Sequence, residues 1–377
     1  MLRLAGMERH DFTGRLAWLR SQLAARDLEA HLVSGPENRR YLSGFTATDE
    51  LLTETSGYLL ITREHAFLLT DFRYREWALA EAVGWQVVIY QKSLGETLAE
   101  VLAEEGIRRL GFEPAYLSVR QYERLTQAAA QAGLKVEWLP QESLVEQARE
   151  IKEPAEVAAI REALRLTEGV LTEVAGLLAP GLTEGQVAWE IEKRLREAGA
   201  EGLAFAPIVA AGKNSARPHH RPGDTPLRPG EPIIIDLGCR VAGYCSDLTR
   251  TFILGEPTPR FREIYDLVRR AQRRAEAGLR AGLTSDAADA LGREVIRQAG
   301  YGEFFGHSLG HGVGLAVHEA PSLSPHADRA TVLKAGSVVT VEPGIYLPEW
   351  GGVRLENLVI LHDTHAEVLT RMGYYEW

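Results

Sequence analysis

The sequence predicts two domains, a smaller α/β domain at residues 1–140 and an α+β domain at residues 141–377. The length of 377 residues exceeds that of a typical single domain, and 45% hydrophobic with 25% charged residues is an ordinary globular composition. Short apolar runs alternate with helical patterns in the first part. Beyond Gly202 the apolar runs end in polar or glycine-rich turns, which is typical of antiparallel hairpins.

In the N-terminal part, the spacing of Phe12, Leu16, Leu19 and Leu23 predicts an amphipathic helix. Strands are expected at 30–34, 58–62, 66–70 and 85–90, and further helices at 74–82, 97–104 and 119–132. Strands interleaved with helices indicate a partly parallel sheet with helical cover. We find no catalytic constellation in this part.

The polar segment 139–154 predicts the domain junction, and long helical patterns follow at 155–178 and 184–199. Two further helices are expected at 260–281 and 284–299. They separate the strand-like runs of the C-terminal part.

Composition and charge exclude several classes of function. A net charge of -10 argues against a general nucleic-acid binder. The first residues, MLRLAGMERHDF, carry charge where a secretory signal has its apolar core, and no run approaches the ~18 apolar residues of a membrane helix. Cys239 and Cys245 are too few for a disulfide framework. We therefore expect a cytoplasmic protein that binds neither nucleic acid nor membranes.

Five residues of the C-terminal part carry the chemistry: Asp236, Asp247, His311, Glu342 and Glu356. Each lies in an apolar or glycine-rich stretch that predicts a buried strand. Buried charges are normally paired or bound to metal, because an isolated buried carboxylate is costly. Four such carboxylates indicate two divalent cations.

The run 232–254 predicts a β-hairpin around small, turn-permissive residues. With a turn centred on Val241 and Ala242, Asp236 and Asp247 are expected to lie directly opposite each other. Their Cβ atoms would then be about 4.5–5.5 Å apart, and their charges would repel unless a cation lay between them. The alternative is one exposed aspartate at each strand end.

The stretches VVTVEPGIYL and GGVRLENLVIL repeat the pattern with Glu342 and Glu356. The alternative here is a buried ion pair with Arg354, which could satisfy one carboxylate but not four. His307, His311 and His318 lie within one glycine-rich stretch, and their spacing alone does not say which binds metal.

A ligand set of carboxylate oxygens with one nitrogen favours manganese, iron(II) or cobalt. Structural zinc is typically bound by sulfur and nitrogen instead. Paired metals can lower the pKa of a bridging water and polarise a carbonyl, which predicts hydrolysis.

The segment HSLGHGVGLAVHE, from His307 to Glu319, resembles the signature of the pita-bread metallopeptidases, in the branch of prolidase (Xaa-Pro dipeptidase) and Xaa-Pro aminopeptidase. IVAAGKNSARPHHRP, ENRRYLSGF and LLTDFRY resemble further segments of that branch, so the similarity spans about residues 30 to 370. The resemblance implies a pita-bread (creatinase/aminopeptidase-like) catalytic domain behind a creatinase/prolidase-like N-terminal domain.

The resemblance also implies a ligand set. Asp236 is expected to chelate one metal, and His311 with Glu342 the other. Asp247 and Glu356 are expected to bridge both. The two metals are expected to be manganese or cobalt, with iron(II) or zinc as further candidates. Glu342 would also handle the proton of the attacking water.

Other roles follow by motif. His219 is expected to stabilise the tetrahedral intermediate or the leaving amine, and His318 to contact the substrate backbone or move protons. His307 and Arg354 are expected to contact substrate or support the ligands. His220 stands where relatives often have glycine, and its simplest interpretation is a surface loop residue.

The resulting hypothesis is an exopeptidase that cleaves before proline in di- or oligopeptides, with the dipeptidase favoured and the Xaa-Pro aminopeptidase as the alternative. A creatinase-like hydrolase should have lost metal ligands, and so should a non-catalytic binding protein. A methionine aminopeptidase usually lacks this N-terminal domain. Relatives are commonly dimers, so a homodimer is expected.

Overall fold

The computed structural model describes residues 12–376 apart from residues 50 and 52, and so omits most of the charged N-terminal stretch discussed above. The described part of the chain divides between Arg149 and Glu150 into two compact units. The sequence-based domain boundary at residue 140 stays a prediction. None of the described helices is long and apolar enough to cross a membrane.

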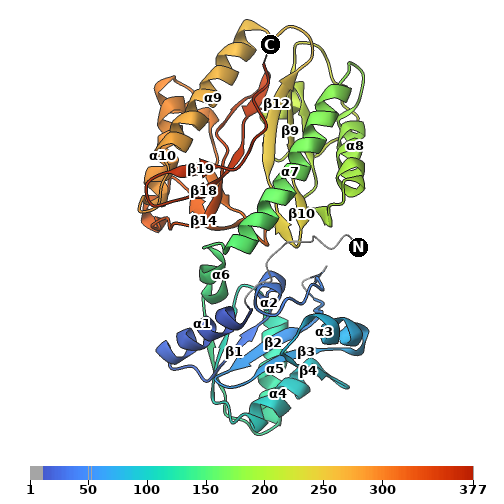
Figure 1. The fold of residues 1–377 in the computed structure, drawn as a ribbon, viewed down its shortest axis with the longest axis vertical. Coiled ribbons are helices and arrows are strands. Elements are labelled where there is room, and N and C mark those ends of the chain that lie inside the picture. The colour runs from blue at the N-terminus through green and yellow to red at the C-terminus, as the bar shows by residue number, and fades with distance from the viewer. Residues whose placement is uncertain (1–11, 50, 52, 377) are drawn as a thin grey trace. The chain divides into compact units, whose positions relative to one another are not determined.

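The N-terminal unit is a mixed sheet with helices packed on it (Figure 1). The strands run in the order β4-β3-β2-β1-β5-β6, in which β1 pairs with β5, β5 with β6 and β3 with β4 in parallel. The strands are β1 (Ala30–Val33), β2 (Tyr58–Thr62), β3 (Ala66–Thr70), β4 (Gln86–Ile89), β5 (Arg109–Phe112) and β6 (Glu137–Pro140). The helices are α1 (Phe12–Ala25), α2 (Pro36–Ser43), α3 (Arg75–Glu81), α4 (Leu94–Glu104), α5 (Val119–Gln131) and α6 (Leu144–Arg149). The predicted α/β character and its partly parallel sheet are confirmed.

Sequence reasoning missed four elements of this unit, namely α2, β5, β6 and α6. Helix α2 shows why. Its buried residues include the polar Asn38 and Arg39 beside Tyr41 and Leu42, so apolar residues make up only part of its core-facing side. Arg39 is tolerated there because Asp49 pairs with its guanidinium at 3.0 Å.

The C-terminal unit places curved antiparallel strands between pairs of helices (Figure 1). Helices α7 (Pro154–Leu177) and α8 (Glu184–Glu197), drawn in green, lie on one side, and α9 (Pro259–Gly278) and α10 (Ser285–Gln298), drawn in orange, on the other. Local sequence fixes their starts. Pro154 and Pro259 occupy first-turn positions, and the Thr183 side chain accepts a hydrogen bond from the Gln186 N–H.

The strands of this unit form several small sheets, in the orders β12-β9-β8, β11-β10-β7, β14-β13-β15-β18-β19 and β16-β17. The strands are β7 (Gly202–Leu203), β8 (Ile208–Ala211), β9 (Pro232–Leu237), β10 (Cys239–Val241), β11 (Tyr244–Cys245), β12 (Leu248–Ile253), β13 (Gly310–Gly312), β14 (Glu319–Leu323), β15 (Val338–Val341), β16 (Gly344–Leu347), β17 (Gly351–Arg354), β18 (Asn357–Leu361) and β19 (Ala366–Val368). Apolar side chains of β12 and of β14 to β18 pack against α9 and α10 in one core cluster.

The predicted hairpin at 232–254 is present, but its predicted turn is wrong. The turn is made by Ala242 and Gly243, with φ of 50° and 83°. Positive φ at both positions is the type I′ geometry favoured in hairpins. Glycine adopts it freely, whereas the β-branched Val241 would be strained. Asp236 therefore lies opposite Thr249 and not opposite Asp247.

Candidate metal centre

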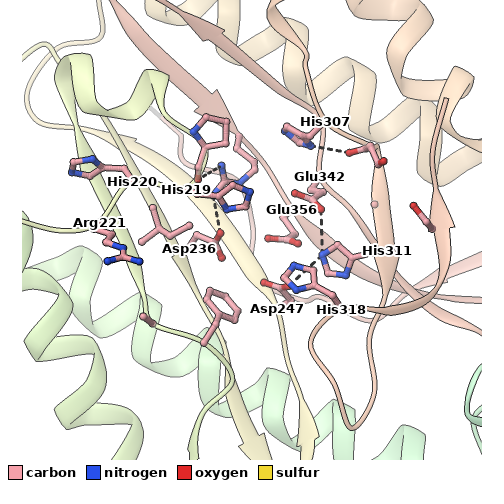
Figure 2. A pocket seen from close by; sticks show the side chains of 18 residues that line it. His219, His220, Arg221, Asp236, Asp247, His307, His311, His318, Glu342 and Glu356 are labelled. Atoms are coloured by element: carbon pink, nitrogen blue, oxygen red, sulfur yellow. Dashed lines mark hydrogen bonds and ion pairs between the residues drawn. The ribbon is translucent and has the colours of Figure 1, made fainter. Parts of the chain in front are cut away.

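The structure brings the five candidate ligands to one cavity of about 460 Å³ (Figure 2). The hairpin shift moves the register by two residues, so Asp236 and Asp247 stay on the same face as diagonal neighbours. Asp236 belongs to β9, and Asp247 directly precedes β12.

The other candidate ligands come from the five-stranded sheet. His311 is in the middle of β13. Glu342 directly follows β15, and Glu356 directly precedes β18, at the points where each predicted long strand breaks in two. Backbone pairing passes there from β15–β18 to β16–β17, so these two acids leave the ladder and their carboxylates reach the cavity.

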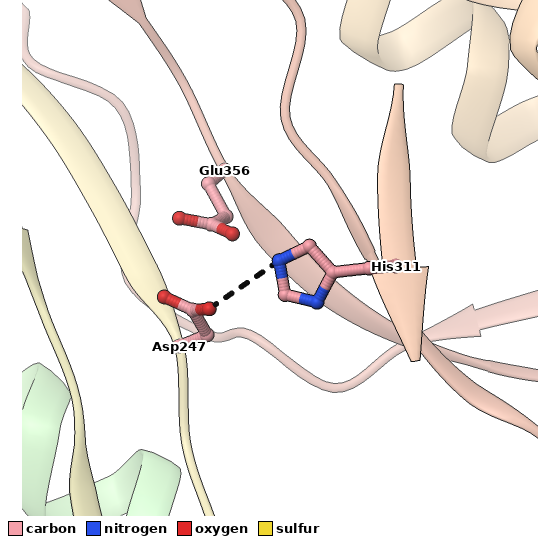
Figure 3. Close-up of side chains that lie close together, drawn as sticks. All are labelled: Asp247, His311 and Glu356. Atoms are coloured by element: carbon pink, nitrogen blue, oxygen red, sulfur yellow. Dashed lines mark ion pairs between the residues drawn. The ribbon is translucent and has the colours of Figure 1, made fainter. Parts of the chain in front are cut away.

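Asp247, His311 and Glu356 each offer one ligand atom, and these atoms all lie within 4.8 Å of one another (Figure 3). His311 Nε2 lies 3.7 Å from Asp247 Oδ2 and 3.3 Å from Glu342 Oε1. His311 Nδ1 is 3.1 Å from the Gly312 carbonyl, an acceptor, so Nδ1 carries the proton. The Nε2 lone pair is thereby directed at the acids, as in a metal-ligating histidine.

Few protein donors serve the carboxylates. Arg354 Nη2 donates to Asp236 Oδ2 at 2.7 Å, whereas Asp236 Oδ1 is buried without a partner among the described residues. The Thr249 hydroxyl donates to Glu356 at 2.6 Å, and Arg354 pairs with Asp236 and not with its strand neighbour Glu356. The ion-pair alternative therefore accounts for one acid only.

The electrostatics of the cavity favour a bound cation. Burial, together with the charges of neighbouring acids, raises the pKa of Asp247 and of Glu342 well above the usual carboxyl range, and raises that of Glu356 to about 8. Burial lowers the pKa of His311 to about 4, which keeps its imidazole neutral. Oxygen-rich acids, an orphaned carboxylate oxygen and a neutral imidazole fit divalent metal ions.

The remaining candidate histidines line the same cavity (Figure 2). The His318 ring centroid lies 4.4 Å from that of His311. His219 is exposed toward the cavity. His307 is partly buried, and burial lowers its pKa to about 4.

A hydrogen-bonded chain connects His307 to the acids. Arg354 Nη1 donates to the Tyr346 hydroxyl at 3.0 Å, and that hydroxyl lies 2.9 Å from His307 Nε2. His307 Nδ1 lies 2.8 Å from the Ser308 carbonyl and so carries the proton, which leaves Nε2 to accept from Tyr346. Arg354 and His307 are thus held in fixed orientations.

Two outcomes differ from or add to the sequence analysis. The interpretation of His220 as a surface loop residue is wrong, because its side chain is 11% exposed and its Nε2 lies 2.8 Å from Glu184. Sequence reasoning also missed Tyr346, Thr249 and Arg221, which contact or line the site. No motif marks them, since a tyrosine, a threonine and a loop arginine are common in any strand or loop.

Comparison with known proteins agrees with this geometry. Residues 158–363 match the model of metallopeptidase family M24, and residues 15–151 match that of the creatinase/prolidase N-terminal domain. The chain is 34% identical over 344 residues to an Xaa-Pro dipeptidase of Pyrococcus horikoshii, covering 91% of this chain and 93% of that protein.

Two solved structures are similar over nearly their whole length. The Xaa-Pro dipeptidase from Bacillus anthracis has a TM-score of 0.90 and 38% identity, covering 97% of this chain and 99% of that one. The X-Pro aminopeptidase from Thermotoga maritima has a TM-score of 0.83 and 34% identity, covering 93% and 97%.

Fold and site together define a hydrolase of α+β architecture, with a pita-bread catalytic domain and a smaller α/β N-terminal domain. The chain belongs to metallopeptidase family M24, in the prolidase and Xaa-Pro aminopeptidase branch. Membership implies divalent metal ions and a peptide substrate. The expectation of a hydrolase is confirmed, which removes the non-catalytic alternative.

Proposed function

We propose that this protein is a dinuclear-metal exopeptidase that hydrolyses the peptide bond before proline, acting as an Xaa-Pro dipeptidase. One observation carries the proposal: Asp247, His311 and Glu356 converge within 4.8 Å in a cavity that Asp236 and Glu342 also line. The cavity offers too few cationic and hydrogen-bonding groups of the protein to balance the charge of so many acids.

In this proposal Asp236 holds one cation, and His311 and Glu342 hold the other. Asp247 and Glu356 are shared between the two. Cations bound here lower the pKa of the attacking water and polarise the scissile carbonyl. The hard donor set favours manganese or cobalt, ahead of iron(II) or zinc.

The remaining polar groups manage protons and charge. Glu342, whose pKa burial raises, accepts the proton of the attacking water. His219 stabilises the tetrahedral intermediate or the leaving amine, and His318 contacts the substrate backbone or moves protons. Arg354 and His307, joined through Tyr346, fix Asp236 and complete the substrate-facing wall.

The choice of a dipeptidase rests on charge at the cavity. A dipeptide presents its free carboxylate close to the scissile bond, and an X–Pro bond offers no N–H for recognition. Arg354 is committed to Asp236, but Arg221 also lines the cavity, is exposed, and pairs with no carboxylate in the described part of the chain. Arg221 is the cation that we assign to the substrate carboxylate.

The Xaa-Pro aminopeptidase remains the second candidate, because one similar structure bears that name. The manganese-loaded protein should cleave Ala-Pro and leave Ala-Pro-Ala and the amide of Ala-Pro largely intact. Efficient cleavage of the tripeptide would instead establish the aminopeptidase. No cleavage of any of the three would refute the X–Pro proposal.

Arg221→Gln tests the carboxylate assignment. We expect KM for Ala-Pro to rise about 2- to 10-fold, as for an exposed charge pair, and the preference for Ala-Pro over its amide to shrink. Arg217→Gln is the matched control, since Arg217 is an exposed arginine of the same loop that does not line the cavity. Equal effects of the two substitutions would count against a specific role for Arg221.

Gel filtration and cell fractionation would test the expected homodimer and cytoplasmic location.

A further inference from the structure

The loop between β8 and β9 carries two adjacent histidines that point in different directions (Figure 2). The His219 ring points toward Asp236, whereas the His220 ring points away from the acids. In the described part of the chain no hydrogen bond holds the His219 ring. The backbone that carries the ring therefore has a larger part in setting its direction.

Glu184, in the first turn of α8, is the anchor of this loop. Its side chain is completely buried. It accepts hydrogen bonds from the Ala211 N–H at 2.8 Å, the Asn214 side chain at 3.0 Å and the Gly223 N–H at 3.2 Å. One buried carboxylate thus holds the loop where it leaves β8 and again beyond the two histidines.

His220, directly after His219 in the chain, also contacts Glu184. Its Nε2 lies 2.8 Å from Glu184 Oε2, and its side chain is 11% exposed. On the other side of the loop, Arg354 Nη1 donates to the Pro218 carbonyl at 3.3 Å, and the Ser215 hydroxyl accepts from the Gly352 N–H at 2.8 Å. His219 is therefore flanked directly by Pro218, tied to β17, and by His220, tied to α8.

We propose that His220 is a positioning residue: its bond to buried Glu184 fixes the loop so that the His219 ring is directed into the cavity. This inference rests on the proposed function, in which His219 acts on the intermediate or the leaving group. Small displacements of a catalytic group lower kcat strongly, whereas ground-state binding of the substrate depends on other contacts.

The test is a double-mutant cycle on manganese-loaded protein with Ala-Pro as substrate. His220→Ala should lower kcat about 10- to 100-fold with little change in KM. In the His219→Ala background the same substitution should cost less than about twofold, because coupled residues are not additive. His220→Gln, whose amide can still donate to Glu184, should restore most of the lost kcat.

His65→Ala is the matched control. His65 forms a similar pair with Glu105, at 2.9 Å, but belongs to the N-terminal unit and does not line the cavity. Its removal should leave kcat unchanged. Thermal unfolding and metal content of each variant show whether the fold and the metal site persist.

The outcomes separate the two hypotheses. Full, additive loss on His220→Ala in the His219→Ala background, or no rescue by glutamine in a folded variant, overturns the positioning role while the proposed function stands. An unchanged kcat in His219→Ala overturns both the role of His219 and this inference.

Discussion

Buried charge is handled differently in the two units. In the N-terminal unit the buried Glu113 accepts from the Ser34 and Gly35 N–H groups and from the Asn38 amide, each at 2.7 Å. Even so, burial raises its pKa to about 7. In the C-terminal unit Glu356 has the Thr249 hydroxyl, and its pKa rises to about 8 beside further acids.

The number of hydrogen-bond donors around Glu113 and around the cavity acids indicates a different role for each. The donors around Glu113 connect β1, α2 and β5, so the carboxylate acts as a structural link. The cavity acids face one another with few donors, and Asp236 Oδ1 has none among the described atoms. When these acids are ionised, their arrangement is stabilised by an added positive charge.

The strongest test of this contrast is Asp247→Asn, which removes one acid without changing the size of the side chain. We expect hydrolysis of Ala-Pro to fall by about 10³-fold or more, since charge stabilisation at the reacting centre is lost, together with a lower metal stoichiometry. Steady-state kinetics and metal analysis measure both. Glu356→Gln should behave alike. Unchanged activity in either variant would contradict the shared-ligand assignment.

A second test uses pH on the metal-free protein. The folded protein keeps a proton on Glu356 up to about pH 8, whereas the unfolded chain releases it near 4.5. The folded state binds more protons in this window, so the free energy of unfolding should fall as pH rises, by up to about 1.4 kcal/mol per pH unit for one group. His311 acts oppositely, but only below 6.5, because its pKa is lowered from that value to about 4.

Urea unfolding at pH 7 and pH 8, with chelator and with manganese, measures the effect. Glu113 titrates in both samples and its contribution cancels in the difference. We expect a steeper decline with chelator than with manganese, since metal keeps the cavity acids ionised in the folded state. At 100 times its Kd the metal itself should add about 2.7 kcal/mol. Identical slopes in both samples would remove the electrostatic argument.

A smaller effect is expected from Tyr346→Phe, which removes the hydroxyl between Arg354 and His307. Loss of a hydrogen bond that supports metal ligands typically lowers metal affinity or activity about 10- to 100-fold. We expect the low end of that range because Arg354 keeps its bond to Asp236. kcat/KM and the metal Kd should both change. A variant with normal metal affinity but reduced kcat/KM would show that the hydrogen bonds through Tyr346 support substrate contact and not metal binding.

The smallest effect on catalysis is expected from Glu113→Gln in the N-terminal unit. Replacing one carboxylate oxygen by an amide leaves a donor facing a donor, so stability should fall by about 1–3 kcal/mol. Activity per folded molecule and metal content should stay unchanged. Loss of metal in this variant would show that the two kinds of buried acid are not independent.

Sequence reasoning succeeded where the signal is local. The apolar runs at 58–62 and 66–70 coincide with β2 and β3, and the pattern at 155–178 with α7. The ligand candidates could be chosen because an acid inside an apolar strand is costly wherever the strand lies. They meet in one cavity because the hairpins place these acids on the same face of the paired strands.

Sequence reasoning failed where a contact between distant segments decides the outcome. The hairpin register depends on whether two residues accept positive φ, and the pattern around Asp236 is compatible with either turn. His220 is a partly buried partner of Glu184, which stands 36 residues earlier in the chain. Helix α2 was missed because two of its buried side chains, Asn38 and Arg39, are polar and find partners elsewhere in the unit.

The spread of the acids along the chain has a consequence for biosynthesis. Glu356 follows Asp236 by 120 residues (356 − 236). At the usual speed of translation the ribosome needs roughly 6–24 s to bridge that gap. During this interval the hairpin with Asp236 and Asp247 emerges without the strands that carry the other candidate ligands. Cations can be captured stably only after that delay, so the nascent chain must carry its unbalanced aspartates in water until then.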